Sequence, residues 1–408
     1  MKILFVHQNF PGQFKFLAPA LVAQGHQVHA MLMNEVSISQ WQGVHLVPYR
    51  AARGSSRSIH PWVADFETKT IRAEANFRKA IDLKNTGYSP DVIIAHPSWG
   101  ESLFLKEVWP ATKLGIYCEF FYHAHGADLE FDAEFADSDI ATPCRIRLKN
   151  LNNLMHFDLA DAGLSPTKWQ ASTYPEGFRK NITVVHDGID TVTLQPNPDA
   201  TFELDTYKLT KQDEVITYVS RNLEPYRGLH VFMRALPALL KARPDAQIIV
   251  VGGDDVSYGS KPASGDSWRS VLTKEIEGSV SATDWQRVHF VGKLPYPKFI
   301  ALLQVSTVHI YLTYPFVLSW SLLEAMSVGA AIIASDTAPV SEVIQHGECG
   351  LLINFFDIEG LVTQTCQLLD NPVQRQRMGN NAREYVRSKF DLRSVCLPKQ
   401  LQWITSLS

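Results

Sequence analysis

Long apolar runs, paired cysteines and a dominant charge are all missing from this sequence. The five cysteines are scattered, odd in number and free of CxxC spacing, so they suggest neither a disulfide framework nor a zinc site. No stretch approaches the roughly 18 apolar residues that span a membrane, so we expect a cytoplasmic protein, with peripheral contact at the inner face of a membrane left open. Lysine and arginine total 38 against 42 aspartate and glutamate residues, a net charge of −4 that is too balanced for a nucleic acid partner.

An acidic metal motif and a dinucleotide-binding glycine motif are also missing. Asp254 and Asp255 lie in a stretch rich in Gly, Ser and Asp, and they are more simply read as polar loop residues than as a DxD metal site. The segment after the first apolar run has no GxGxxG, which disfavours a dehydrogenase. We therefore predict no metal ion and no cofactor.

The apolar segments that are present predict an α/β protein. Hydrophobic residues make up 45% of the 408 residues, and a chain of this length is expected to form two or three domains. Short apolar runs alternate with segments of helical period, which is typical of parallel sheets. The predicted strands are residues 3–6, 27–32, 44–47, 91–95, 114–121, 182–185, 215–219, 247–251, 288–291, 308–312 and 330–334.

The pattern favours two doubly wound, Rossmann-like domains. The first is expected over residues 1–190 and the second over 213–390, with a linker over 191–212 where the periodicity lapses. Ligands of open α/β sheets bind at the carboxyl ends of the strands, so two such domains facing each other would form a deep cleft. Residues 65–84 predict a helix with a basic face, which we interpret as solvated, the alternative being an acceptor or anionic surface site.

The first chemical signal is a pair of arginines, Arg221 and Arg227, between a predicted strand and the helix that begins near Leu229. Guanidinium groups offer fixed bidentate donors, and a helix N-terminus adds aligned amide dipoles. This pair suits a diphosphate. The alternative is two surface arginines beside a helix-entry turn.

The second signal is the segment from Tyr314 to Gly329, in which Ser321 and Glu324 have the spacing of a capping box. Amide groups near Ser319 would face any ligand at the start of this helix. Glu324 is therefore either an N-terminal cap residue or a carboxylate that accepts hydrogen bonds from a ribose diol.

These two segments, in this order, resemble the C-terminal domain of the retaining glycosyltransferases of family 4, the glycosyl transferases group 1, which have the GT-B fold. The resemblance implies that Arg221 and Arg227 bind the diphosphate of a sugar donor. It also implies that Glu324, as the second Glu of an E-x7-E motif, binds the ribose. The first Glu of that motif usually contacts hexose hydroxyls, and Phe316 stands in its place here.

The resemblance extends through the whole chain and implies further site residues. Gly12 and Gln13 look like the first glycine loop, which approaches the donor phosphate, and residues 291–294 look like the segment whose backbone reads the base. Gly252 and Gly253 end a strand like the family's VGxG, with close packing as the alternative. Residues 391–408 are expected to pack back on the first domain. The other donor-binding candidates are Gly292, Lys293, Leu294, Leu318, Ser319, Trp320 and Ser321.

Two registers compete for the residue that family members place near the anomeric carbon. His125 to Asp128 reads His-Gly-Ala-Asp and resembles the family's HGxD, whereas counting along the strand from Leu114 reaches Glu119. We favour His125 because four residues fit rather than one. On the acceptor side we name Asp128 and His96, the latter being equally well a satisfied core histidine.

Together these features predict a retaining, metal-independent hexosyltransferase. It would move a sugar from a nucleoside diphosphate, most simply UDP or GDP, to a hydroxyl acceptor on a glycan or lipid-linked molecule. Synthesis of a polysaccharide, glycolipid or other glycoconjugate is the expected context, with the oligomeric state left open. The alternatives are a nucleotide-sugar epimerase on the same fold and a noncatalytic nucleotide-sugar-binding partner subunit, the second motivated by Phe316.

Overall fold

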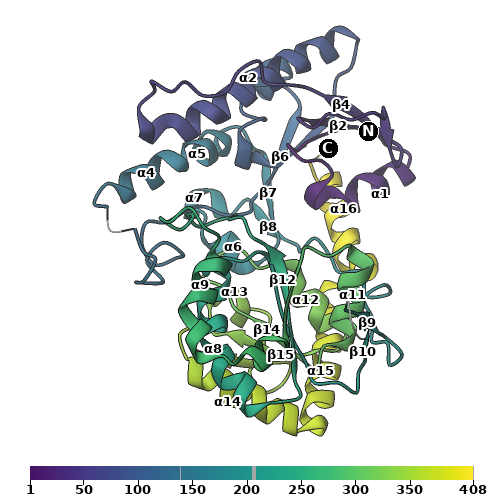
Figure 1. The fold of residues 1–408 in the computed structure, drawn as a ribbon. Helices are drawn as coiled ribbons and strands as arrows, with labels where there is room; N and C mark the ends of the chain where they lie inside the picture. The colour runs from purple at the N-terminus through teal and green to yellow at the C-terminus, as the bar shows by residue number, and fades with distance from the viewer. Residues whose placement is uncertain (138, 205–207, 408) are drawn as a thin grey trace. The chain divides into compact units, whose positions relative to one another are not determined.

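In a computed structural model, which describes residues 1–137, 139–204 and 208–407, the chain divides into two compact units. The first unit comprises residues 1–130, 137–188 and 393–408, and the second comprises 131–136 and 189–392. Residues 205–207 of the expected linker and Ser408 at the end of the expected terminal segment lie outside the described residues. Figure 1 shows the order of the elements along the chain.

Two segments belong to a different unit from the one that the sequence predicted. The expected linker, 191–212, is part of the second unit, where Leu194, Phe202 and Leu209 are buried. Its apolar residues are spaced too irregularly to show a period, because the segment is coil and a two-strand hairpin. Residues 131–136 of the expected first domain also belong to the second unit.

The first unit is built on an eight-stranded sheet with the order β3-β4-β2-β1-β5-β6-β7-β8. β3 runs antiparallel to β4, and the remaining strands run parallel to their neighbours. The strands are β1 (Lys2–Val6), β2 (Gln27–Leu32), β3 (Gln40–Trp41), β4 (Val44–Pro48), β5 (Val92–Ala95), β6 (Lys113–Tyr117), β7 (Ala162–Ser165) and β8 (Ile182–Val184).

The helices of this unit cover both faces of its sheet. The α-helices are α1 (Leu17–Ala23), α2 (Ala64–Asn85), α3 (Leu105–Val108), α4 (Thr142–Lys149), α5 (Leu151–Phe157), α6 (Lys168–Ser172), α7 (Glu176–Arg179) and α16 (Leu397–Thr405). The 3-10 turns are η1 (Gly12–Phe14), η2 (Pro61–Val63) and η3 (Pro97–Trp99), and a π-helical turn, η6 (Leu392–Cys396), precedes α16. The terminal segment packs in this unit because Gly115 of β6 has no side chain: a Cβ there would lie 2.6 Å from the indole of Trp403.

The second unit is built on a six-stranded parallel sheet with the order β13-β12-β11-β14-β15-β16, beside the hairpin of β9 and β10. Its strands are β9 (Phe202–Glu203), β10 (Lys208–Leu209), β11 (Val215–Asn222), β12 (Gln247–Gly253), β13 (Val288–Gly292), β14 (Val308–Tyr311), β15 (Ala331–Ser335) and β16 (Leu351–Ile353). Its helices are α8 (Leu229–Ala242), α9 (Trp268–Ile276), α10 (Ala282–Trp285), α11 (Tyr296–Val305), α12 (Trp320–Ser327), α13 (Ala338–Ser341), α14 (Ile358–Asp370) and α15 (Pro372–Phe390), with 3-10 turns η4 (Pro225–Arg227) and η5 (Glu277–Ser279).

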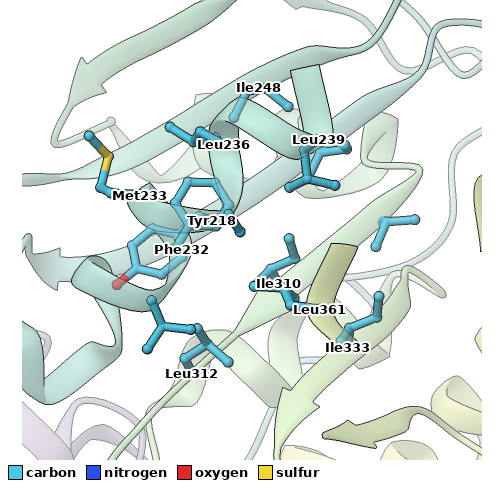
Figure 2. Packing of buried hydrophobic residues seen from close by; sticks show 14 of the residues in the cluster. Tyr218, Phe232, Met233, Leu236, Leu239, Ile248, Ile310, Leu312, Ile333 and Leu361 are labelled. Atoms are coloured by element: carbon cyan, nitrogen blue, oxygen red, sulfur yellow. The ribbon is translucent and has the colours of Figure 1, made fainter. Parts of the chain in front are cut away.

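Two apolar cores sandwich this six-stranded sheet. Helices α8, α9 and α14 cover one face, and α11, α12 and α15 cover the other (Figure 1). Figure 2 shows the first core, in which Phe232 and Leu236 of α8 face Tyr218 and Ile248 of the sheet. The rings of Tyr218 and Phe232 are stacked with their centroids 4.7 Å apart. Burying such side chains stabilises each by about 1.5–3 kcal/mol, so α8 is fixed on the strands whose ends carry the candidate site.

Both sheets change winding direction at one position, and this position decides where ligands bind. In chain order the second sheet reads 3-2-1-4-5-6, the order of nucleotide-binding Rossmann domains, with the reversal between β11 and β14. In the first sheet the reversal lies between β1 and β5. Ligands of such sheets bind at the carboxyl ends of the strands on either side of the reversal.

The predicted strands are present, with one shortened and several missed. The strand expected over 114–121 ends at Tyr117, because beyond Cys118 the backbone leaves the ladder and Phe121 donates its N–H to the hydroxyl of Thr173 instead. The sequence did not predict β3, β7, β9, β10 or β16, which are two to four residues long. Such runs are too short to show a period.

Candidate functional site

A polar cluster in the first unit occupies the carboxyl ends of the strands at its reversal point. His7 directly follows β1, and His96 directly follows β5. Gln13 lies between them: its amide nitrogen is 3.4 Å from Nε2 of His96 and 3.4 Å from Oε1 of Glu119. Nε2 of His96 is also 3.8 Å from the other oxygen of Glu119. The structure therefore brings together three residues that the sequence named separately.

Hydrogen bonds fix the tautomer of His7. Its Nδ1 accepts from the backbone N–H of Asn9, so its proton lies on Nε2 and is donated to Oε1 of Gln13 over 2.9 Å. This bond orients the amide of Gln13 so that its NH2 group points to Glu119. Burial lowers the pKa of His7 to about 4 and the pKa of His96 well below its ordinary value, so both imidazoles are neutral at pH 7.

Gly12 is required beside His7 for two reasons. Its φ is +47°, in the region that glycine adopts without strain, and a Cβ on it would lie 2.3 Å from Nε2 of His7. Any side chain there would displace the imidazole that holds Gln13. The glycine loop expected from the sequence thus supports this cluster directly.

The structure places the two competing residues, Glu119 and His125, in different surroundings. Glu119 is in the cluster with Gln13, and its side chain is 37% exposed. His125 lies on a turn with its side chain 72% exposed, and Nδ1 lies 2.6 Å from Glu130. Asp128 is buried. The choice of His125 for the position near the anomeric carbon remains a prediction.

Residues 131–136 form a strap, so named here, that is anchored in the second unit. The carboxylate of Asp132 accepts from the hydroxyl of Tyr314 over 2.7 Å and lies 3.0 Å from Nε2 of His230. Although burial opposes it, these two hydrogen bonds hold the pKa of Asp132 below its ordinary value. Glu134 forms a two-bond ion pair with Arg234. The strap therefore contacts the loop that follows β14 and carries Phe316.

The two arginines named from the sequence, Arg221 and Arg227, differ in environment. Arg221 lies at the end of β11 and is exposed. Arg227 ends η4 and is 7% exposed. Its Nη1 donates to the hydroxyl of Thr313 over 2.7 Å and to the carbonyl of Val317 over 3.1 Å. Arg227 thus links the end of β11 to the segment after β14, across the reversal point.

Glu324 lies on α12 but is not the capping residue. The N-cap of α12 is Ser319, whose hydroxyl accepts from the N–H of Ser321. The capping-box interpretation of Ser321 and Glu324 is therefore wrong, since the helix begins two residues earlier than that spacing requires. Glu324 is 7% exposed, and its Oε1 accepts from the hydroxyl of Tyr296 over 2.8 Å.

Phe316, which replaces the first motif glutamate, lies in an aromatic cluster. It is 4% exposed and meets the ring of Tyr258 edge-on, with centroids 4.9 Å apart. Tyr226 is a second T-shaped neighbour at 5.7 Å. Where the family motif has a carboxylate, this chain has an apolar wall. Leu318 is buried beside it, and Trp320 is half-buried in the first turn of α12.

The segment expected to read the base follows β13. Gly292 has a φ of +65°, Lys293 is exposed and Leu294 is half-buried. A Cβ on Gly253 would lie 2.6 Å from Cε of Lys293, and a Cβ on Gly252 would lie 2.7 Å from the side chain of Leu223. Close packing thus requires glycine at position 252, whereas at Gly253 the nearest atom belongs to the flexible end of Lys293.

Sequence reasoning missed three residues of these sites: His7, Tyr296 and Glu224. His7 carried a usable signal, since it directly follows the first strand. Tyr296 donates to Glu324, 28 residues away, and Glu224 accepts from backbone N–H groups 33 or more residues away. No local pattern in the sequence reveals such partners.

A cavity of about 710 Å³ lies beside α2 in the first unit. Its lining includes the side chains of Val36, Tyr49 and Ile71. It also includes the basic side chains of Arg50, Arg78 and Lys79. Two basic residues of α2 are paired with carboxylates: Lys69 is buried against Asp65, and Arg78 pairs with Glu74. The acceptor-site alternative for this helix stays open.

In residues 1–137, 139–204 and 208–407, no group of three or more His, Cys, Asp or Glu side chains is arranged to hold a metal ion. Asp254 and Asp255 pair with Arg269 and Lys261. Within the same ranges, no helix combines the length and the apolar character needed to cross a membrane.

Solved structures with the same architecture define the class of the fold, which is GT-B. Sucrose-phosphate synthase from Thermosynechococcus elongatus aligns over 100% of both chains with a TM-score of 0.74 and 18% identity. HepE from Anabaena, solved in complex with UDP-glucose, aligns over 100% of both chains with a TM-score of 0.68 and 14% identity. WaaG, a glycosyltransferase involved in lipopolysaccharide biosynthesis, aligns over 99% of both chains with a TM-score of 0.65 and 16% identity.

Family models identify the group within this class. The model described as glycosyl transferase family 4 group matches residues 24–194, and the model described as glycosyl transferases group 1 matches residues 201–385. The chain belongs to this family of glycosyltransferases.

Curated relatives are distant. N-acetyl-alpha-D-glucosaminyl L-malate synthase of Bacillus anthracis is 26% identical over 395 residues, covering 92% of this chain and 88% of its own length. D-inositol 3-phosphate glycosyltransferase of Corynebacterium glutamicum is 25% identical over 211 residues, covering 51% of this chain. The match spans only about half of that relative's length, 48%.

Proposed function

We propose that this protein transfers a hexose-type sugar from a nucleoside diphosphate to a hydroxyl acceptor with retention of configuration and without a metal ion. The observation that carries the proposal is the reversal point of the second sheet. There an exposed Arg221 lies at the end of β11, and a buried Arg227 and the N-terminus of α12 lie on elements that follow β11 and β14. These are the groups that bind a diphosphate, and Glu324 lies one turn into α12.

The chemistry asked of these residues is mainly electrostatic. As the glycosidic bond breaks, negative charge develops on the leaving diphosphate, and fixed guanidinium groups and helix amides stabilise it without reorganisation. Glu324 would accept hydrogen bonds from the ribose hydroxyls, and backbone groups of residues 292–294 would contact the base. Two arginines and a helix end supply the positive charge that a divalent cation supplies elsewhere.

UDP and GDP are the expected nucleotides, and the complex of HepE with UDP-glucose supports UDP as the first choice. The acceptor would be a hydroxyl of a glycan or lipid-linked molecule, bound on the side of the first unit that carries His96 and Asp128. The names of the relatives, which include an N-acetyl-alpha-D-glucosaminyl L-malate synthase and a D-inositol 3-phosphate glycosyltransferase, support hydroxyl acceptors as a class.

A noncatalytic nucleotide-sugar-binding subunit is the second candidate, and one observation favours it. Phe316 and its aromatic neighbours stand where a carboxylate would hold the sugar hydroxyls. An epimerase remains an alternative on the same fold.

A binding screen followed by a turnover assay tests the proposal. Calorimetry with UDP, GDP, ADP and their sugars should identify one nucleotide that binds. Product formation on a panel of hydroxyl acceptors, with the anomeric configuration read by NMR, should show retention. Binding without turnover on any acceptor would favour the subunit, and release of a free epimer would favour the epimerase.

A further inference from the structure

The loop after β12 is held by a buried carboxylate that the proposed mechanism does not use. Glu224, the N-cap of η4, is 0% exposed. Its two oxygens accept from three consecutive backbone N–H groups, those of Ser257, Tyr258 and Gly259, over 3.0–3.2 Å. We call this arrangement the Glu224 clasp.

The clasp and the loop conformation depend on each other. A buried carboxylate is costly unless hydrogen bonds satisfy it, and these three amides do so. A second bond, from the side-chain amide of Asn222 to the hydroxyl of Ser257 over 2.8 Å, ties the same turn to the end of β11. The turn is thus fixed to the strand end that also carries Arg221.

The clasp determines where Tyr258 lies. The guanidinium carbon of Arg227 is 5.2 Å from the centroid of the Tyr258 ring, and the Tyr258 hydroxyl helps to raise the pKa of Arg227 against the opposing effect of burial. The ring also contacts those of Phe316 and Tyr226, with centroids 4.9 Å and 6.2 Å away. Tyr258 is 38% exposed, whereas Arg227 and Phe316 are 7% and 4% exposed. Of these three side chains, Tyr258 is the most exposed to a bound ligand.

We propose that the Tyr258 hydroxyl donates a hydrogen bond to the donor diphosphate beside Arg227, and that Glu224 is the positioning residue that places it there. The inference rests on the proposed function and adds a phosphate contact to it. A tyrosine hydroxyl donates to a phosphate oxygen without adding charge, and the nearby guanidinium favours the same anion.

Calorimetry on the full chain tests the proposed hydrogen bond from Tyr258, with UDP and uridine as the two probes. If the wild type binds GDP or ADP instead, that nucleotide and its nucleoside are used. Tyr258→Phe keeps the ring and removes the hydroxyl, and Glu224→Gln replaces an oxygen that accepts by a nitrogen that donates. Each variant should weaken diphosphate binding about tenfold and leave nucleoside binding unchanged. Asp255→Asn, which breaks an exposed ion pair of the same loop with Lys261, is the matched control and should bind like the wild type.

A double variant separates positioning from a general effect on structure. If Glu224 acts through Tyr258, Glu224→Gln should weaken diphosphate binding by less than twofold when Tyr258 is already Phe. Tyr258→Phe binding the diphosphate like the wild type would overturn the inference, as would equal losses for diphosphate and nucleoside. If Glu224→Gln fails to fold, Tyr258→Phe decides alone. A wild type that binds no nucleoside diphosphate would overturn the proposed function and the inference with it.

Discussion

Replacing Glu324 by Gln separates its two roles, ribose ligand and helix residue. The carboxylate is 7% exposed and accepts from the hydroxyl of Tyr296, while Ser319 caps the helix. Gln keeps one acceptor oxygen for Tyr296 and leaves the cap intact. We therefore expect the melting temperature of Glu324→Gln to stay close to that of the wild type.

The effect on nucleotide binding should be much larger. A carboxylate accepts from both ribose hydroxyls, whereas an amide offers one acceptor oxygen, which Tyr296 already uses, and an NH2 group that can only donate. An unsatisfied buried polar group costs about 1–3 kcal/mol, so the affinity for the nucleoside diphosphate should fall by a factor of roughly 5 to 150. A 2′,3′-dideoxy nucleotide should bind the wild type and Glu324→Gln with similar, weakened affinity.

The assay is calorimetry paired with thermal unfolding, and Tyr296→Phe is the control. This variant removes the hydroxyl and leaves the carboxylate, so it should cost about 1 kcal/mol of stability and still discriminate against the dideoxy nucleotide. The reasoning is refuted if Glu324→Gln melts well below the wild type and discriminates the dideoxy nucleotide as strongly.

Four further predictions concern other residues. Arg227→Ala should weaken nucleoside diphosphate binding by about 1.5–3 kcal/mol and nucleoside binding far less, and equal losses by calorimetry would contradict the phosphate assignment. Activity should persist in excess EDTA, and a loss that magnesium or manganese restores would contradict metal independence. Asp132→Ala should lower the free energy of unfolding, measured in urea at pH 7, by about 1–3 kcal/mol. The pKa of Asp132 is depressed in the folded protein, so its carboxylate stabilises the fold above the unfolded pKa of about 3.9. This stabilisation should shrink as the pH falls through the lower pKa of the folded state. Burial raises the pKa of Glu101 to about 7, so the folded state favours its protonated form. The free energy of unfolding should therefore fall by up to about 3 kcal/mol as the pH rises from about 4.5 to 7. Glu101→Gln should show a flatter dependence of this free energy on pH.

The sequence by itself was sufficient to predict the α/β class, most of the longer strands and the residues around the second reversal point. Strands such as β1 and β12 are nearly continuous apolar runs because both faces of a parallel sheet are covered, and this pattern is local. Arg221 could be named because it lies at the end of a recognisable strand, and Glu324 because the spacing within residues 314–329 is a local motif. The local pattern was insufficient where a segment is short or irregular, as with β7 and residues 191–212.

Only the tertiary structure decided which side chains act together. Asp132 meets His230 across 98 positions, Gln13 meets Glu119 across 106, and Glu224 meets the loop after β12 across more than 30. These contacts exist because parallel strands far apart in sequence end at the same edge of a sheet, in an order that the pairing of whole strands sets. The partner of Glu324 was decided in the same way, because Tyr296 reaches it from α11, and no spacing within α12 contains that information.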